Sequence, residues 1–224
     1  MEYNKIIPIG YGCGISFVLK HLNLRKETSL FEWFVTKSLD DVTNLINMIT
    51  NDISNVNISK IDMSSFNQIH RIYINGENMF SDHYDYNEYI KIFERRAKRF
   101  INDIQTHNGN ILFVRNLDYN ENISSDMVDN FNKSIHNINP NLNFKLLLVS
   151  NVLKKYKFNK ITSDNVFHTY IAKKDIKCVY WFQKTPQINL WLDAFKQAGF
   201  VSHSLDDFNN DFLNVNDNDV KFWK

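Results

Sequence analysis

The 224-residue chain has few of the features that mark several protein classes. It has 2 cysteines, too few for a disulfide framework, and no Cys/His spacing suits a zinc site. No run of about 18 apolar residues is present to span a bilayer. The N-terminus lacks the basic region and apolar stretch of a signal peptide. We therefore expect a cytoplasmic protein without membrane spans, metal or cofactor.

The chain also lacks an excess of either charge. Lys+Arg 26 against Asp+Glu 25 gives a net charge of +1, so no overall field favours nucleic acid or a membrane as a partner. Arg95, Arg96, Lys98 and Arg99 are expected mostly on the solvated side of an amphipathic helix, without the interleaved aromatic residues of a nucleic-acid footprint. The substrate and the oligomeric state stay open.

Apolar residues recur at helical spacing in several segments. Ser38 is a plausible N-cap for one of them, with Asp40 and Asp41 in its first turn. Pro186 begins another, which is expected to end at Gly199. The predicted helices cover about 15–22, 39–49, 86–105, 123–135 and 186–198.

Short apolar runs predict the strands. The segments 111–114 and 144–149 enclose the 123–135 helix, and this order favours parallel pairing through a right-handed crossover. Further strands are expected at 6–9, 72–74, 166–170 and 179–182. The pattern predicts a single α/β domain over 1–205, with a mainly parallel sheet flanked by helices in a Rossmann-like three-layer arrangement. The polar segment 206–224 is expected to be loosely attached.

Glycine is scarce, with 6 in the chain, yet three of them follow the first predicted strand as Gly10, Gly12 and Gly14. Such a concentration indicates positive φ angles or a close approach by another group. The spacing is not that of the dinucleotide fingerprint, and no P-loop lysine follows. Cys13 lies within this turn, where a helix N-terminus would lower the pKa of a thiol and favour an oxyanion. An ordinary tight strand-to-helix turn fits the same pattern.

Arg115 directly follows the 111–114 strand. Ligands of parallel sheets bind beyond the carboxyl ends of the strands, so Arg115 and Cys13 would face one crevice. A guanidinium there suits a carboxylate or phosphate. The alternative is a structural ion pair with Asp118 or a helix terminus.

His83 lies between Asp82 and Asp85, just before the long 86–105 helix. A neighbouring carboxylate fixes the tautomer of a histidine and raises its basicity, and a thiol nucleophile needs such a base nearby. The alternative is that one aspartate caps the helix and His83 is a surface residue.

Several blocks in this order resemble a family described as papain-like cysteine peptidases, the domain of unknown function 1796. The resemblance covers roughly the first two-thirds of the chain, and in two places this chain departs from it: Leu30 stands where the family has Pro, and Glu32 where it has Asp. The blocks that carry it are Ile9-Gly10-Tyr11-Gly12-Cys13, Leu22-Asn23-Leu24-Arg25, Phe31-Glu32-Trp33, His83-Tyr84-Asp85, Tyr89 through Arg95-Arg96, Arg99 and Phe100, and Ile111-Leu112-Phe113-Val114-Arg115.

The resemblance implies that Cys13 is a nucleophile, His83 its base, and Asp85 or Asp82 the orienting acid. The parallel α/β layout predicted from the residues is nevertheless not that of papain, which carries its cysteine on a central helix against an antiparallel sheet. The candidate substrate-binding residues are Gly12, Gly14, Arg25, Trp33 and Arg115.

Three functions fit these observations. The first is a cysteine-dependent hydrolase or acyl-transferring enzyme, with a peptide, acyl or glycan-related substrate. The second is a glycan-related transferase or a protein that binds sugar nucleotides or phosphate through the glycine turn and Arg115. The third is a non-catalytic module that uses aromatic residues such as Trp33 to bind a partner.

Overall fold

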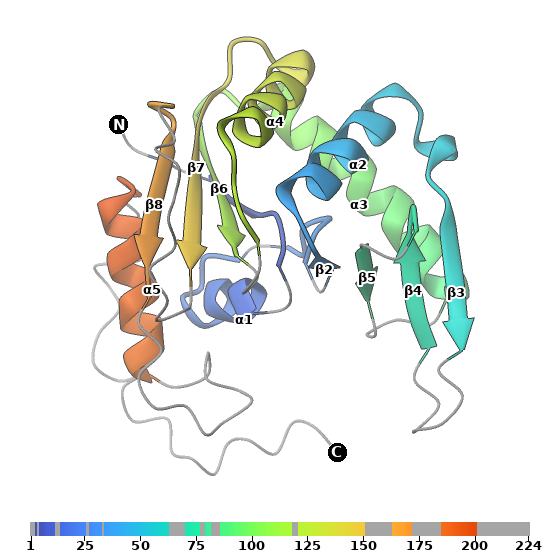
Figure 1. Ribbon diagram of the computed structural model, residues 1–224, viewed down its shortest axis with the longest axis horizontal. Coiled ribbons are helices and arrows are strands. Elements are labelled where there is room, and N and C mark those ends of the chain that lie inside the picture. Colours follow the sequence, from blue (N-terminus) through green and yellow to red (C-terminus); the bar gives the residue numbers. More distant parts are fainter. Residues whose placement is uncertain are drawn as a thin grey trace.

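A four-stranded parallel sheet is the main layer of the fold (Figure 1). The computed structural model describes residues 3, 5–11, 14–25, 27–32, 34–62, 70–76, 79–81, 86–117, 121–150, 163–171 and 185–200. The order across the sheet is β1-β6-β7-β8, and every neighbouring pair is parallel. Its strands are β1 (Lys5–Pro8), β6 (Asn110–Asn116), β7 (Asn143–Ser150) and β8 (Val166–Tyr170).

The two central strands are apolar on both faces because helices cover both. Along β6, Ile111 and Phe113 belong to one hydrophobic cluster, whereas Leu112 and Val114 belong to a second cluster on the opposite face. This alternation is the strand period of two, applied to a sheet buried on both sides.

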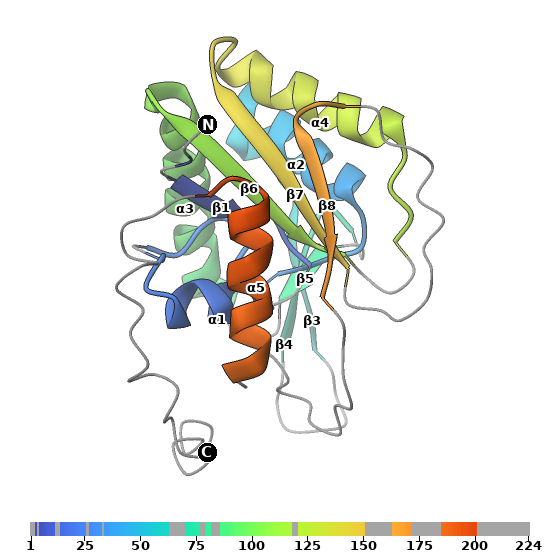
Figure 2. The ribbon, with the colours of Figure 1, turned by 90° about the vertical axis from the view of Figure 1, so that its left-hand side faces the viewer.

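Five α-helices and one short 3-10 helix are described, and the α-helices cover both faces of the parallel sheet. Residues of α1 and α5 pack in one hydrophobic cluster, and those of α2, α3 and α4 in the other (Figure 2). The resulting three-layer α/β arrangement confirms the predicted fold class. The helices are α1 (Gly14–His21), α2 (Leu39–Asn51), the 3-10 helix η1 (Ile53–Asn55), α3 (Tyr86–Thr106), α4 (Ser125–Ile138) and α5 (Thr185–Gln197).

A second, antiparallel sheet stands beside the parallel one, in the order β2-β5-β4-β3. Of its strands, the sequence predicted only the segment around 72–74. Ile72, Ile74 and Met79 join the same cluster as α2 and α3, so this sheet extends the core on that side. Its strands are β2 (Val35–Thr36), β3 (Ile58–Asp62), β4 (His70–Ile74) and β5 (Met79–Ser81).

The strand–helix–strand unit from β6 through α4 to β7 is confirmed, as are the five predicted α-helices, each within a few residues of its expected ends. Gly199 has a φ of +88°, which agrees with its predicted place at the end of α5. The strand expected at 179–182 and the segment 206–224 lie outside the described residues.

The start of α2 is fixed by the cap that the sequence predicts. The Oγ of Ser38 accepts a hydrogen bond from the Asp41 amide at 3.1 Å, and the Asp41 carboxylate accepts one from the Ser38 amide at 2.9 Å. This reciprocal pair is a capping box, and it holds the chain where it passes from β2 into α2.

Replacing Ser38 by Ala should therefore lower the free energy of unfolding by about 1 kcal/mol, because the first turn of α2 loses its side-chain acceptor. Urea unfolding followed by circular dichroism measures the change. Ser54→Ala, which removes an exposed hydroxyl that contacts Asp52 but caps no α-helix, is the control. Equal losses in the two variants would contradict a specific capping role.

Candidate functional site

The turn that leaves β1 is bound to the end of β6. The Ile9 amide donates to the Val114 oxygen at 2.9 Å, and the Tyr11 amide donates to the Asn116 oxygen at 3.1 Å. The Asn116 amide in turn donates to the Gly10 oxygen at 3.2 Å. The chain at residues 9–11 is thus held at the carboxyl end of the parallel sheet, where the sequence placed a site.

Gly10 is required at this turn for two reasons. Its φ is +85°, a conformation that disfavours any residue with a Cβ. A Cβ built on Gly10 would also collide with Oγ1 of Thr36, with Nη1 of Arg115 only 3.2 Å away. The sequence predicted positive φ or a close approach, and Gly10 shows both.

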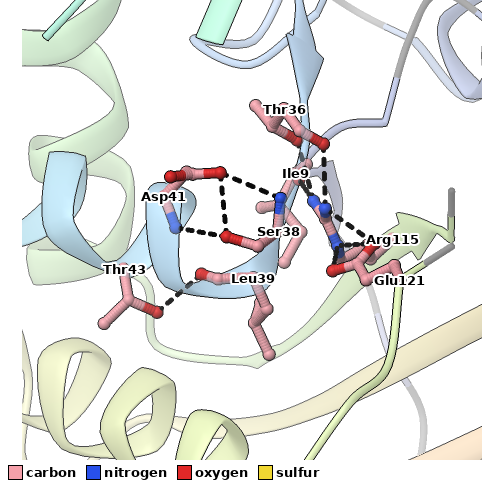
Figure 3. A network of polar contacts seen from close by, with 8 residues as sticks. All are labelled: Ile9, Thr36, Ser38, Leu39, Asp41, Thr43, Arg115 and Glu121. Carbon is pink, nitrogen blue, oxygen red and sulfur yellow. Dashed lines mark hydrogen bonds and ion pairs between the residues drawn. The ribbon is translucent and has the colours of Figure 1, made fainter. Parts of the chain in front are cut away.

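Two side chains approach Gly10, that of Thr36 and that of the fully buried Arg115. Figure 3 shows the contacts of the Arg115 guanidinium with Ile9, Thr36 and Glu121. The Nε of Arg115 donates to both carboxylate oxygens of Glu121, at 2.8 and 3.0 Å, and Nη2 donates to Oε2 at 2.8 Å. Nη1 donates to the Ile9 oxygen at 3.0 Å and to Thr36 Oγ1 at 2.9 Å. Nη2 also donates to the Thr36 oxygen at 3.0 Å.

An arginine side chain has five N–H donors, and these contacts engage all of them. Arg115 therefore joins four parts of the chain: β6, the turn after β1, β2 and the segment that carries Glu121. In this arrangement its guanidinium has no N–H left for the carboxylate or phosphate of a substrate. Arg115 therefore forms a structural ion pair, the alternative to ligand binding that the sequence left open. Its partner is Glu121 rather than Asp118 or a helix terminus.

The other predicted site residues divide into two groups. Gly14 is the first residue of α1, and Arg25 follows the end of that helix, where its Nε pairs with Oε2 of Glu32 at 2.8 Å. The remaining candidates lie outside the described residues: Gly12, Cys13, Trp33, His83 and Asp85.

A cavity of about 430 Å³ lies along the edge of β1 that faces away from β6. Its walls are β1, the segment after α1, and α3, which stands beside β1 on the side away from β6 (Figure 2). Among the described residues it is lined by Lys5, Ile6, Ile7, Pro8, Leu19, Asn23, Leu24, Arg25, Glu27, Ser29, Leu30, Glu32, Arg96, Arg99, Phe100, Asp103, His107 and Phe200.

Glu32 is the most deeply buried charged group of this cavity, with 1% of its surface exposed. Its Oε2 pairs with Nε of Arg25 at 2.8 Å, and its Oε1 accepts a hydrogen bond from the Ser29 amide at 2.7 Å. Burial raises the pKa of Glu32, and the Ser29 hydrogen bond and the charges of Arg25, Arg96 and Arg99 only partly offset this effect.

Two arginines of α3 face the same cavity. Arg96 is 7% exposed, and Arg99 is partly buried, with its Nη1 2.9 Å from Oε2 of Glu27. The sequence pattern predicted that the basic residues of 95–99 lie mostly on the solvated side of the helix. This is correct for Arg95 and Lys98 but wrong for Arg96.

The sequence does contain a signal for the buried position of Arg96. It stands three residues after Phe93 and four before Phe100, so helical geometry puts it on the apolar face of α3. No comparable signal pointed to Glu121 or Thr36, which meet Arg115 only through tertiary structure.

Within the described ranges, none of the helices has the length and apolar content of a membrane span. The described residues also contain no group of three His, Cys, Asp or Glu side chains placed to hold a metal ion.

The fold and the glycine turn define a parallel α/β protein whose first strand leads into a short helix through Gly10 and Cys13. A family model described as "Putative papain-like cysteine peptidase (DUF1796)" matches residues 4–152. The chain belongs to this family, which confirms the resemblance noted in its sequence. Neither the curated proteins nor the solved structures provide a match.

Glu121→Gln should lower the free energy of unfolding by about 3–5 kcal/mol, because it leaves the buried guanidinium of Arg115 without its counter-charge. Urea unfolding measures the effect. Asp129→Asn, which removes an exposed carboxylate from α4, is the matched control and should change stability by less than about 0.5 kcal/mol. A loss below about 1 kcal/mol for Glu121→Gln would show that the ion pair does not fix this region.

Glu32→Gln should change how stability depends on pH. Because the folded protein raises the pKa of Glu32 above 4.5, the contribution of this group is present below pH 4.5 and is lost as the pH rises through the folded pKa. Glutamine does not titrate, so the variant should gain stability relative to wild type as the pH increases. Urea unfolding of both proteins between pH 4 and pH 8, at about half-unit steps, tests the sign. A difference that stays constant or falls would contradict the raised pKa.

Proposed function

We propose that the chain is a cysteine-dependent hydrolase or acyl-transferring enzyme in which Cys13 is the nucleophile. The observation that supports this most is the position of the turn before it. Residues 9–11 are held to β6 at the carboxyl end of the sheet, and Gly14 begins α1, so Cys13 comes between a fixed turn and the first turn of a helix. The family match includes Cys13, His83 and Asp85.

The first turn of a helix has amides without intrahelical partners and the positive end of the helix dipole. Both favour the thiolate form of a cysteine there. In the proposed reaction, His83 takes the proton from Sγ of Cys13, and the thiolate attacks the acyl carbon of the substrate. The amides of Cys13 and Gly14 would stabilise the oxyanion of the tetrahedral intermediate.

Collapse of this intermediate breaks the bond to the leaving group, which takes the proton from His83. The acyl group is then held on Cys13 as a thioester. Water, or an acceptor hydroxyl or amine, attacks the thioester with His83 again as the base, and the thiol is restored. Asp85, or Asp82 in its place, would hold the His83 ring in the required orientation.

The alternative of a phosphate-binding or sugar-nucleotide-binding protein depended on Arg115 as the anion ligand. All five of its N–H groups are engaged by Glu121, Thr36 and Ile9. This saturation favours the hydrolase proposal over that alternative.

The test is the pH dependence of Cys13 alkylation by iodoacetamide, measured by mass spectrometry in a Cys178→Ser background. We expect an apparent pKa clearly below the ordinary value of about 8.5. His83→Ala should raise this pKa toward the ordinary value. Asp85→Asn and Asp82→Asn, compared in the same assay, should identify which carboxylate orients His83.

Substitution of His21, in α1, by Ala is the control for loss of a histidine elsewhere. A thiol that reacts equally with and without His83 would contradict the Cys–His pair. An inert thiol would favour the non-catalytic alternative.

A further inference from the structure

The cavity beside β1 combines buried charge with an apolar surface. On α3, Arg96, Arg99 and Phe100 follow one another at helical spacing and all line it. Leu30 and Phe200, both nearly fully buried, line it as well. Its volume of about 430 Å³ lies within the range of small-molecule sites. Apolar and charged residues both contribute to its lining.

The charges that line the cavity do not balance. Among the described lining residues, four are cationic and three are carboxylates, so one positive charge is in excess. The cations are Lys5, Arg25, Arg96 and Arg99, and the carboxylates are Glu27, Glu32 and Asp103. The excess suits a ligand with a single negative charge.

The three carboxylates are not equally fixed. Glu32 is buried and held by both Arg25 and the Ser29 amide. Asp103 pairs with Lys5 at 2.7 Å. Glu27, in contrast, pairs with Arg99 while its side chain is 49% exposed. An ion pair with so exposed a partner contributes little, so another carboxylate can replace it at small cost.

We propose that this cavity binds a small organic monocarboxylate, whose carboxylate replaces Glu27 on Arg99, beside Arg96, and whose apolar body lies against Leu30 and Phe100. Arginine is suited to this role because its planar guanidinium presents several N–H donors to a carboxylate. Nη2 of Arg99 also donates to the Thr28 oxygen, and this bond keeps the guanidinium in place when Glu27 is replaced. The proposal involves none of the residues of the Cys13 mechanism, so each can fail without the other.

The experiment is isothermal titration calorimetry of the full chain with 3-phenylpropionate, repeated with the neutral 3-phenylpropionamide and with phenyl phosphate. The carboxylate should bind saturably, and the amide at least about tenfold more weakly, because it lacks the charge that pairs with the arginines. Phenyl phosphate carries more negative charge than the excess in the cavity and should bind more weakly than the carboxylate.

Three variants locate the site. Arg99→Gln should weaken binding of 3-phenylpropionate by about tenfold or more. Arg95→Gln removes the same charge from an exposed position of α3 and should change it by less than about twofold. Glu27→Gln should tighten binding by about two- to fivefold, because the competing carboxylate is removed. Thermal unfolding by circular dichroism checks that each variant is folded.

Several results would overturn the proposal. One is a lack of saturable binding by 3-phenylpropionate, butyrate and hexanoate at concentrations up to about 10 mM. Another is equal binding of the acid and the amide, which would indicate a purely apolar site. Equal losses in Arg95→Gln and Arg99→Gln would indicate general attraction, and tighter binding of phenyl phosphate would indicate a phosphate site instead.

Discussion

The buried guanidinium of Arg115 is the constraint on which the arrangement of the glycine turn depends. A buried charge is tolerated only if it is paired and all its hydrogen bonds are made, and Arg115 meets both conditions with groups from separate parts of the chain. Thr36 and Glu121 must therefore stand where they do, and Gly10 must lack a side chain. The turn that precedes Cys13 is thus positioned by the contact of Arg115 with Ile9, together with the backbone hydrogen bonds of the turn to β6 and the positive φ that Gly10 permits.

The arginines of this protein differ in how their charge is compensated. Arg115 forms an ion pair with Glu121, which is itself buried, so a dissolved ligand cannot reach either charge. Arg99 pairs with Glu27, which water reaches. The same chemical group can fix a fold in the first setting and exchange partners in the second. A buried counter-ion, such as Glu121, indicates that the arginine has a structural role. An exposed counter-ion, such as Glu27, leaves the arginine able to take another partner.

The sequence predicted those elements whose signals are local. The capping box at Ser38, the βαβ unit from β6 to β7 and the end of α5 at Gly199 each depend on residues near one another in the chain. Of the second sheet, only the segment at 72–74 was predicted. The strands β2 and β5 have 2 and 3 residues, too few to show a period, and the apolar residues of β3, Ile58 and Ile61, do not alternate with a period of two. Ile9 and Thr36 lie 106 and 79 residues from Arg115, and the cavity also joins separate segments, so no spacing pattern encodes these contacts. Glu121 is near Arg115 in the chain but belongs to no helix or strand whose period would have predicted the pair.

Glu32 illustrates how the structure changes the meaning of a sequence difference. The resemblance gives an aspartate at this position, and the longer side chain first suggests altered geometry at the proposed catalytic residues. In the structure, its carboxylate pairs with Arg25, accepts from the Ser29 amide and lines the cavity beside α3. Glutamate and aspartate carry the same charge, so the difference from the family changes the length of the side chain that reaches Arg25 and the Ser29 amide beside this cavity, and not the charge there.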